Sequence, residues 1–111
     1  MNMRSYNCGR KETEEFKKIV SLSFLLRAIA EESRLKILCL VRRGKLCVCG
    51  IAEALDLSQS LVSHHLADLK KIGLVKDEKR GQKVYYQLTT LGRKVISLLR
   101  EINIKNQKEA K

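Results

Sequence analysis

The chain has 111 residues, of which 44% are hydrophobic, and a formal net charge of +11. This length allows one domain with a small core that would gain from dimerisation. The excess of positive charge makes a nucleic acid the leading partner, with an anionic membrane as the competing interpretation.

No apolar run approaches the ~18 residues that a membrane-spanning helix needs, and no signal peptide precedes the fold. We therefore expect a cytoplasmic protein that does not span a membrane. In that compartment the four cysteines are more typical of free thiols or metal ligands than of a disulfide framework.

The N-terminal part of the chain divides into an arm and a long helix. Residues 1–11 are polar and basic and predict a flexible arm that carries Cys8. Residues 12–30 place apolar side chains at helical spacing after an acidic start, which suits the positive end of a helix dipole. The second half of this helix is apolar over a wider arc than one buried stripe requires, which indicates a face shared with another subunit.

Two further helices are predicted between residues 34 and 55. The first covers residues 34–43 and is ended by Gly44. Cys39 shares a face of this helix with Leu35, so we expect it in the core, with a reserve role as a ligand or redox partner. After the sequence KLCVC comes a short helix over residues 50–55.

A short turn joins this helix to the next one, and the pair predicts a helix-turn-helix. Ser58 can cap the second helix, Gly73 ends it, and one apolar stripe recurs at helical spacing. The opposite face carries short polar side chains on its first turns, which suits a helix that reads base edges in a major groove. An ordinary amphipathic surface helix is the alternative. His65 is expected to make a structural hydrogen bond. The residues of this helix expected to contact DNA are Ser58, Gln59, Ser60, Ser63, His64 and Lys71.

In residues 74–88 the sequence pattern changes from the helical spacing to an alternation of every second residue, as in a β-strand. This pattern predicts a β-hairpin with a glycine-containing loop. The tip of the hairpin is basic, so we interpret it as a wing that grips phosphates or a minor groove. The alternative is a solvated charged loop. The wing residues assigned to DNA are Lys79, Arg80 and Lys83.

Thr89 or Thr90 can cap a last helix that has one apolar stripe. Together with the first helix it offers two apolar faces that one small core cannot cover, so we expect a homodimer. The folded domain is expected over residues 12–106, followed by a basic tail at 107–111. The predicted dimer interface consists of Leu22, Leu25, Leu26, Ile29, Val95, Leu98, Leu99 and Ile102.

The order of these elements and four local phrases resemble the ArsR/SmtB family of metal-responsive transcriptional repressors. The phrases are LRAIAEESRLKIL, LCVCGIAEAL, LSQSLVSHHLADLKKIGLV and GQKVYYQL, and with the flanking helices they extend from about Leu22 to Ile102. The resemblance implies a mainly α fold with a small β-hairpin, a winged helix-turn-helix in the order α-α-α-α-β-β-α. It also implies a homodimer that represses an operator, expected to be an imperfect palindrome, and releases it when an inducer ion binds. No cofactor is expected to be required for DNA binding.

Cys47 and Cys49 lie at the start of the short helix that precedes the reading helix. Side chains two residues apart diverge on a regular helix but can converge at a frayed helix start. A helix N-terminus lowers the pKa of a thiol, and soft thiolates select ions such as zinc, cadmium, lead or arsenic(III). Without the resemblance, two small half-buried residues would be an equally good interpretation; the family phrase CVC at this place favours ligands.

The chain departs from the family pattern at three places. Simple arsenic repressors carry a third cysteine where this chain has Ala52, and the cadmium- and lead-responsive branch uses a cysteine pair from its arm where this chain has only Cys8. Thiolates from Cys8, Cys47 and Cys49 would suit three-coordinate lead or arsenic(III), or zinc or cadmium completed by an outside ligand. The family's other zinc site, on the last helix, is expected to be missing because Glu101 is the only acidic residue there.

Three other functions compete with that of a metal-responsive repressor. An enzyme is not expected, because there is no glycine-rich phosphate loop, no nucleophile elbow and no credible acid–base pair. A non-sensing architectural DNA binder would account for the charge but not for CVC. A repressor of the same fold that responds to thiol oxidation cannot be separated from a metal sensor by sequence.

Overall fold

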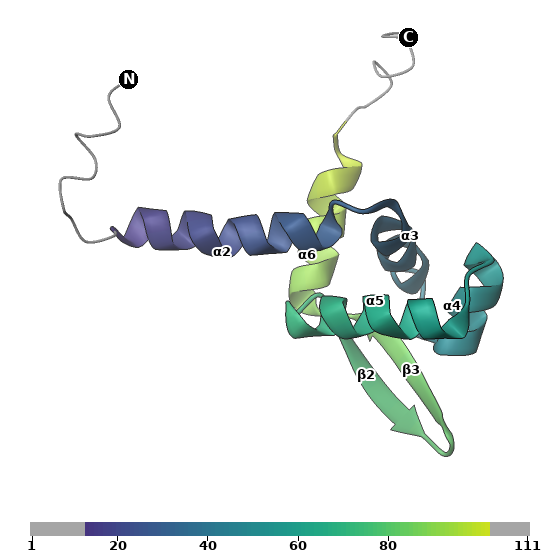
Figure 1. Cartoon of the computed structure of the whole chain (residues 1–111). Helices are drawn as coiled ribbons and strands as arrows, with labels where there is room; N and C mark the ends of the chain where they lie inside the picture. The colour runs from purple at the N-terminus through teal and green to yellow at the C-terminus, as the bar shows by residue number, and fades with distance from the viewer. Residues whose placement is uncertain (1–12, 103–111) are drawn as a thin grey trace, which may run out of the picture.

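The computed structural model describes residues 13–102, which form five helices and three strands (Figure 1). The predicted arm with Cys8, and the predicted tail at 107–111, lie outside the described residues. The expected order of helices, hairpin and last helix is confirmed, with one additional short strand. The elements are α2 (Glu14–Ile29), α3 (Glu32–Val41), β1 (Leu46–Cys47), α4 (Val48–Leu55), α5 (Gln59–Lys71), β2 (Val75–Arg80), β3 (Lys83–Leu88) and α6 (Thr90–Arg100).

Side-chain caps fix where the helices begin. Ser58 Oγ accepts a hydrogen bond from the Leu61 amide at 3.1 Å at the start of α5, and Thr89 Oγ1 accepts one from the Gly92 amide at 3.0 Å at the start of α6. Such a cap is worth about 1 kcal/mol, because it satisfies an amide that has no partner within the helix. The predicted cap at Ser58 is confirmed, and Thr89 rather than Thr90 caps α6.

The three strands form one antiparallel sheet in the order β1-β3-β2. Arg80 is paired with Lys83, so the hairpin loop consists of Gly81 and one further residue, and Gly81 adopts a left-handed φ of 64°. Lys79 and Arg80 therefore lie in β2 and not in the loop. The strand β1, which was not predicted from the sequence, pairs Cys47 with Tyr85.

The core lies between the helices and the base of the hairpin. Leu74 follows α5 and is fully buried, and its carbonyl oxygen lies so close to Gly92 that a Cβ at that position would collide with it. Glycine at position 92 therefore allows α6 to approach the base of the wing. The core also contains Ile37, Leu38, Val41, Ile51, Val62, Leu66, Leu69, Val75, Leu88 and Ile96.

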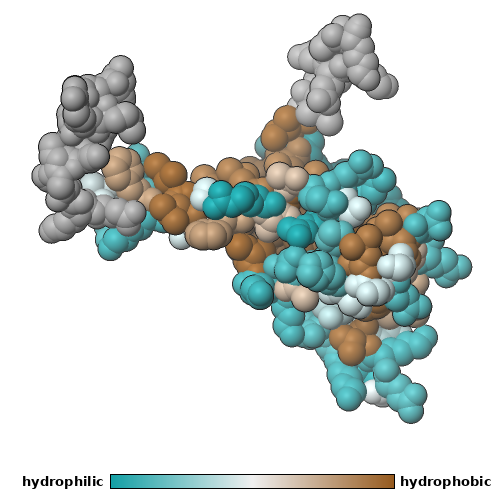
Figure 2. Space-filling model, in the orientation of Figure 1, coloured by the Kyte–Doolittle hydropathy of each residue, from teal (hydrophilic) through white to brown (hydrophobic). Residues whose placement is uncertain are grey.

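Helix α2 projects from this body, with much of its apolar surface uncovered (Figures 1 and 2). Leu22 is 52% exposed on α2, and Leu98 is 59% exposed on α6. Ile29 differs from the other residues of the predicted interface, because it is only 5% exposed and packs in the chain's own core. Within the described part of the chain, no helix combines the length and hydropathy needed to cross a membrane.

Cys39 does not lie in the core, contrary to expectation. It is exposed on α3 and lines an open hollow of about 660 Å³ with Leu35 and Leu40, whereas the buried side of α3 is formed by Ile37 and Leu38. The prediction rested on the helical face that Cys39 shares with Leu35, and it was wrong because Leu35 itself lies on the outer side of α3.

Candidate nucleic-acid interface and thiol site

The outward face of α5 carries the polar side chains that the sequence pattern assigned to DNA. All six of them are exposed, while Val62, Leu66 and Leu69 on the opposite side are fully buried. The apolar side of α5 thus packs against the core, and its polar side is exposed to solvent. The exposed residues are Ser58, Gln59, Ser60, Ser63, His64 and Lys71.

Arg34 on α3 holds α5 in place. Its Nε donates a hydrogen bond to Nδ1 of His65 at 3.2 Å, and its Nη2 donates one to Oδ2 of Asp68 at 2.8 Å. Its Nη1 also donates to the carbonyl of Ala28 in α2 at 3.1 Å. One guanidinium therefore joins three helices, and the predicted structural role of His65, which is 7% exposed, is confirmed.

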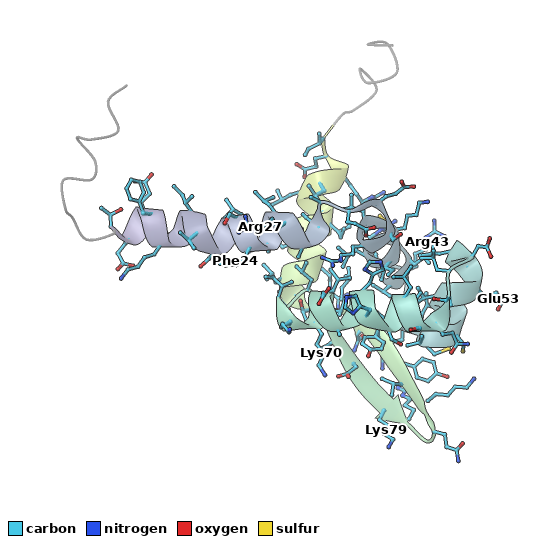
Figure 3. All side chains as sticks on the ribbon, viewed as in Figure 1. Phe24, Arg27, Arg43, Glu53, Lys70 and Lys79 are labelled. Carbon is cyan, nitrogen blue, oxygen red and sulfur yellow. The ribbon has the colours of Figure 1, made fainter. Side chains whose placement is uncertain are left out.

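The hairpin extends from the body next to α5 and ends in exposed basic side chains (Figure 3). Lys79, Arg80 and Lys83 lie in the outer half of the hairpin, and their exposure is compatible with contacts to phosphates. Glu78 accepts hydrogen bonds from Arg80 at 3.3 Å and from Lys45 at 2.7 Å. These two hydrogen bonds lower the pKa of Glu78, which stays ionised.

Two ion pairs connect the hairpin to the body. Lys45, just before β1, pairs with Glu78 at 2.7 Å, and Lys70, at the end of α5, pairs with Asp77 at 3.0 Å. Figure 3 shows Lys70 at the base of the hairpin and Lys79 farther out. Neither pair was anticipated from sequence, since each joins residues whose proximity depends on how the hairpin folds back.

The two predicted thiols converge at the start of α4. Cys47 is the N-cap residue, with extended φ and ψ, and its Sγ accepts a hydrogen bond from the Gly50 amide at 3.4 Å. Because Cys47 is outside the helix and Cys49 is in its first turn, the two Sγ atoms lie 2.7 Å apart. Cys47 is half-buried and Cys49 is exposed, so an ion or an oxidant can approach the pair.

The environments of the two thiols differ. A hydrogen bond from the Cys49 thiol, helped by the Gly50 amide, lowers the pKa of Cys47. The same sulfur–sulfur interaction raises the pKa of Cys49, because that thiol gives its proton to the shared bond. The positive charge of Lys83 on β3 favours the thiolate form of both sulfurs, but its effect is smaller than that of the sulfur–sulfur hydrogen bond, so the pKa of Cys49 remains raised. Cys47 is therefore the sulfur that carries the negative charge first.

The thiol pair alone does not complete a metal site. Within residues 13–102, no three His, Cys, Asp or Glu side chains are clustered closely enough to hold an ion. Ala52, at the position of the third cysteine in arsenic repressors, is buried in the core. Cys39 lines the hollow on α3, which does not include Cys47 or Cys49. Within the described residues, Cys47 and Cys49 thus bring together two sulfurs of the kind that thiophilic ions prefer.

Residues 31–77 match the sequence profile of the arsR family of bacterial regulatory proteins. The arsenical resistance operon repressor of Staphylococcus aureus is 39% identical over 88 residues, which cover 78% of this chain and 85% of that protein. The chain belongs to the ArsR family, and the resemblance seen in the sequence is confirmed. Its wing and helix-turn-helix are those of a family of transcription regulators and not of enzymes.

Other relatives are covered less completely. The arsenic resistance transcriptional regulator ArsR1 of Pseudomonas putida is 38% identical over 73 residues, which are 65% of this chain and 57% of that protein. The cadmium resistance regulatory protein CadC of Lactococcus lactis is 41% identical over 80 residues, which are 71% of this chain and 66% of that protein. The chain thus spans less than two thirds of the length of these relatives.

Solved structures give the same fold. Reduced HlyU from Vibrio cholerae superimposes with a TM-score of 0.74 at 39% identity, covering 83% of this chain and 98% of that one. A homodimeric winged helix-turn-helix DNA-binding domain of a possible ArsR-family regulator from Mycobacterium bovis gives a TM-score of 0.74 at 25% identity, covering 83% and 86%. The predicted winged helix-turn-helix fold is therefore confirmed.

Proposed function

We propose that this protein is a sequence-specific, DNA-binding transcriptional repressor that releases its operator when a soft metal or metalloid ion binds Cys47 and Cys49. The observation that carries the proposal is the convergence of two sulfurs, 2.7 Å apart, at the helix that immediately precedes the exposed polar face of α5. An ion bound there is separated from the DNA-reading residues by one helix of eight residues.

DNA would be held by two surfaces with different tasks. The polar N-terminal part of α5 enters the major groove, where Gln59, Ser60, Ser63 and His64 reach base edges. The basic outer half of the hairpin, with Lys79, Arg80 and Lys83, contacts the phosphate backbone or the minor groove. The net charge of +11 supports this assignment, because counterions released from DNA favour the binding of cationic proteins.

The DNA-binding unit is proposed to be a homodimer formed through α2 and α6. Leu22, Leu26, Leu98 and Ile102 are exposed apolar side chains that need a cover. Leu25, Val95 and Leu99 are half-buried and continue the same surface towards the core. A two-fold axis would present two copies of α5 to half-sites about one helical turn apart, so the operator is expected to be an imperfect palindrome.

Ion binding would act on the shape of the helix-turn-helix. An ion bound to both sulfurs would tie the N-cap residue Cys47 to Cys49 in the first turn of α4. The coordination geometry of the ion, rather than the hydrogen bond between the thiols, would then set the arrangement of this turn. A bound cation also neutralises thiolates close to DNA, which by itself would favour DNA binding. Release therefore requires that the change in shape outweigh the change in charge.

The third ligand is proposed to be Cys8, which lies outside the described residues. Three thiolates suit lead or arsenic(III), and an additional outside ligand would complete a site for zinc or cadmium. The names of the relatives from Pseudomonas putida and Lactococcus lactis point to arsenic and cadmium as the first ions to test.

The test is a titration of the protein–DNA complex with arsenite, lead, cadmium and zinc. Cys47→Ser and Cys49→Ser should bind DNA with nearly unchanged affinity and lose release by the inducing ion. Cys8→Ser should weaken ion binding less. Cys39→Ser is the matched control, since it removes an exposed thiol remote from the CVC sequence, and it should respond like the wild type. If the double variant at Cys47 and Cys49 is released at the wild-type ion concentration, the proposed sensor site is wrong.

The short distance between the sulfurs also favours a second candidate function, that of a repressor that responds to thiol oxidation. Transfer of two electrons to an oxidant, with loss of both thiol protons, would join Cys47 and Cys49 as a disulfide. DNA release by diamide in the absence of metal, together with the loss of two free thiols per chain, would support this redox switch. Release by ions with all thiols still titratable would support the metal sensor.

A further inference from the structure

Cys47 belongs to the helix-turn-helix and to the wing at the same time. It is the N-cap residue of α4, and it is also the last residue of β1, where it is paired with Tyr85 of β3. Tyr85 is paired on its other side with Glu78 of β2. Cys47, Tyr85 and Glu78 therefore form one rung across the three-stranded sheet, and a displacement of Cys47 acts on the wing directly.

A side-chain contact reinforces this rung. Lys45, two residues before Cys47, reaches across the sheet to Glu78, with Nζ 2.7 Å from Oε1. Both side chains are partly exposed, at 35% and 44%. Because β1 has only two residues, its backbone pairing is short, and the ion pair adds a direct contact between the thiol segment and β2.

The wing residues assigned to DNA follow this rung immediately. Lys79 and Arg80 are the next two residues after Glu78, so they lie within about 7 Å of it along the strand, at ~3.3 Å per residue. Arg80 also shares Glu78 with Lys45, through its Nε at 3.3 Å from Oε2. A change in the position of Cys47 is thus relayed to the basic side chains without passing through α4 or α5.

We propose that ion binding at the thiol pair weakens DNA binding through the wing as well as through the reading helix, and that Lys45 and Glu78 are the positioning residues of this second route. The inference rests on the proposed function of Cys47 and Cys49 as the ion site. In this second route the bound ion moves the hairpin relative to α5. The polar face of α5 and the basic half of the hairpin then no longer fit the same duplex simultaneously.

The first experiment is hydrogen exchange of the full-length protein with and without Cd²⁺, in the absence of DNA. Peptides that cover β3 and β2 should change their exchange on addition of Cd²⁺, along with peptides from α4. The Cys47→Ser/Cys49→Ser variant should show no change in the wing. A wild-type response confined to α4 and α5 would overturn the proposal.

The second experiment compares two variants that each remove one lysine from an ion pair between body and wing. Lys45→Met breaks the pair on the thiol side, and Lys70→Met breaks the pair between Lys70 and Asp77 on the α5 side, which has a similar length of 3.0 Å. Each variant loses one positive charge, so direct losses of DNA affinity are matched. The measured quantity is the coupling factor, the ratio of DNA dissociation constants with and without Cd²⁺, on a duplex enriched from a random pool by the wild type.

Lys45→Met should lower the coupling factor by about two- to fivefold, the range that a single exposed ion pair can supply, while Lys70→Met leaves it unchanged. Lys45→Arg keeps the charge and should keep the coupling. Cd²⁺ affinity, followed by the ultraviolet absorbance of the cadmium–thiolate bonds, should stay near the wild-type value in all three variants. Equal coupling factors for Lys45→Met and Lys70→Met would overturn the proposal.

The wild-type protein separates the two ways in which these experiments can fail. If none of arsenite, lead, cadmium and zinc releases wild-type protein from the duplex, the proposed function fails; if one of the others releases it and Cd²⁺ does not, that ion takes the place of Cd²⁺ in both experiments. If the wild type is released but the wing peptides do not respond and Lys45→Met retains full coupling, only the route through the wing is wrong.

Discussion

Arg34 and His65 are 31 positions apart in the sequence, yet Nε of one donates a hydrogen bond to Nδ1 of the other at 3.2 Å. Nδ1 of His65 accepts this hydrogen bond, and His65 is buried on the side of α5 that faces away from its exposed polar residues. The same guanidinium reaches Asp68 at 2.8 Å and the carbonyl of Ala28 at 3.1 Å. The orientation of α5 is therefore fixed by a residue that is not among those proposed to contact DNA.

Replacing Arg34 by Met should destabilise the fold. The substitution keeps much of the aliphatic bulk but leaves the mostly buried His65 nitrogen and Asp68 without their donor, which should cost about 2–3 kcal/mol. Urea unfolding at fixed protein concentration measures this. Lys36→Met is the control, because Lys36 and Glu32 form an exposed pair that should contribute less than ~0.5 kcal/mol. Equal losses for both variants would contradict the structural role of Arg34.

The sequence predicted those features that depend on local pattern. Ser58 marks the start of α5 through its capping side chain, and the stripe of Val62, Leu66 and Leu69 identifies the buried side. A period of two is visible in the hairpin because each strand has six residues. The strand β1 has only two residues, too few to show any period, so the link between Cys47 and the wing could not be predicted.

Features that depend on tertiary packing were also missed. Cys39 and Leu35 share one face of α3, and nothing local distinguishes an apolar outer face from an inner one, so Cys39 was placed wrongly in the core. Ile29 continues the apolar face of α2 but turns into the chain's own core at the end of the helix. Lys45 and Lys70 are ordinary surface lysines in the sequence, and their partners are defined only when the hairpin has formed.

Gly92 should not tolerate any side chain. A Cβ at this position would overlap the carbonyl oxygen of Leu74 and would press on the side chain of Leu88. Gly92→Ala must therefore displace α6 from the base of the wing, at a cost of roughly 2–3 kcal/mol. Denaturant unfolding tests this, with Ser97→Ala at an exposed position of the same helix as a control within about 0.5 kcal/mol of wild type. An unchanged stability for Gly92→Ala would contradict the close packing.

Direct base reading by α5 predicts a loss of specificity. Gln59→Ala or Ser63→Ala should cost roughly 1–3 kcal/mol on the enriched duplex and much less on random DNA, because only the former offers matched base edges. Both side chains are exposed and neither caps the helix, so the fold should remain intact. Fluorescence anisotropy with both duplexes measures the difference. Equal losses on the two would mean that these residues do not read bases.

A phosphate contact from the wing predicts the opposite pattern. Arg80→Ala should weaken binding to enriched and random duplexes alike and reduce the slope of affinity against salt by about 1, as expected for one lost phosphate contact. Lys36→Ala, an exposed lysine on α3 that is not assigned to DNA, serves as the charge-matched control. A salt slope that is the same for Arg80→Ala and wild type would remove the wing from the DNA interface.

The proposed dimer interface can be tested with residues that do not support the fold of one chain. Leu98→Glu places a charge on an exposed apolar position of α6 and should dissociate the dimer. Burial of one leucine side chain contributes about 1.5–3 kcal/mol to the free energy of association, and a two-fold interface contains Leu98 from both subunits. Leu35→Glu, also at an exposed leucine but on α3, should leave the dimer intact. Sedimentation equilibrium gives the mass of both. A wild-type monomer at micromolar concentration would contradict the arrangement of two half-sites.

The two thiols should ionise in a fixed order. The hydrogen bond from Cys49 and the Gly50 amide lower the pKa of Cys47, whereas the shared bond raises the pKa of Cys49. Since only the thiolate reacts with iodoacetamide, the reaction of each sulfur increases as pH rises through its own pKa. Cys47 should therefore become reactive at a pH below the ordinary thiol value of about 8.5, and Cys49 at a pH above it.

Alkylation is measured at a series of pH values by mass spectrometry of the peptides. Variants that retain only one of the two thiols give the pKa of each separately. In Cys49→Ala the remaining thiol loses its donor, so the pKa of Cys47 should rise towards the ordinary value; in Cys47→Ala the pKa of Cys49 should fall towards it. An ion that needs both thiolates must displace the proton of Cys49, so its apparent affinity should increase with pH until that thiol is ionised. If Cys49 were alkylated at lower pH than Cys47, the charge would reside on the helical thiol, and the capping hydrogen bond to Cys47 would not govern the site.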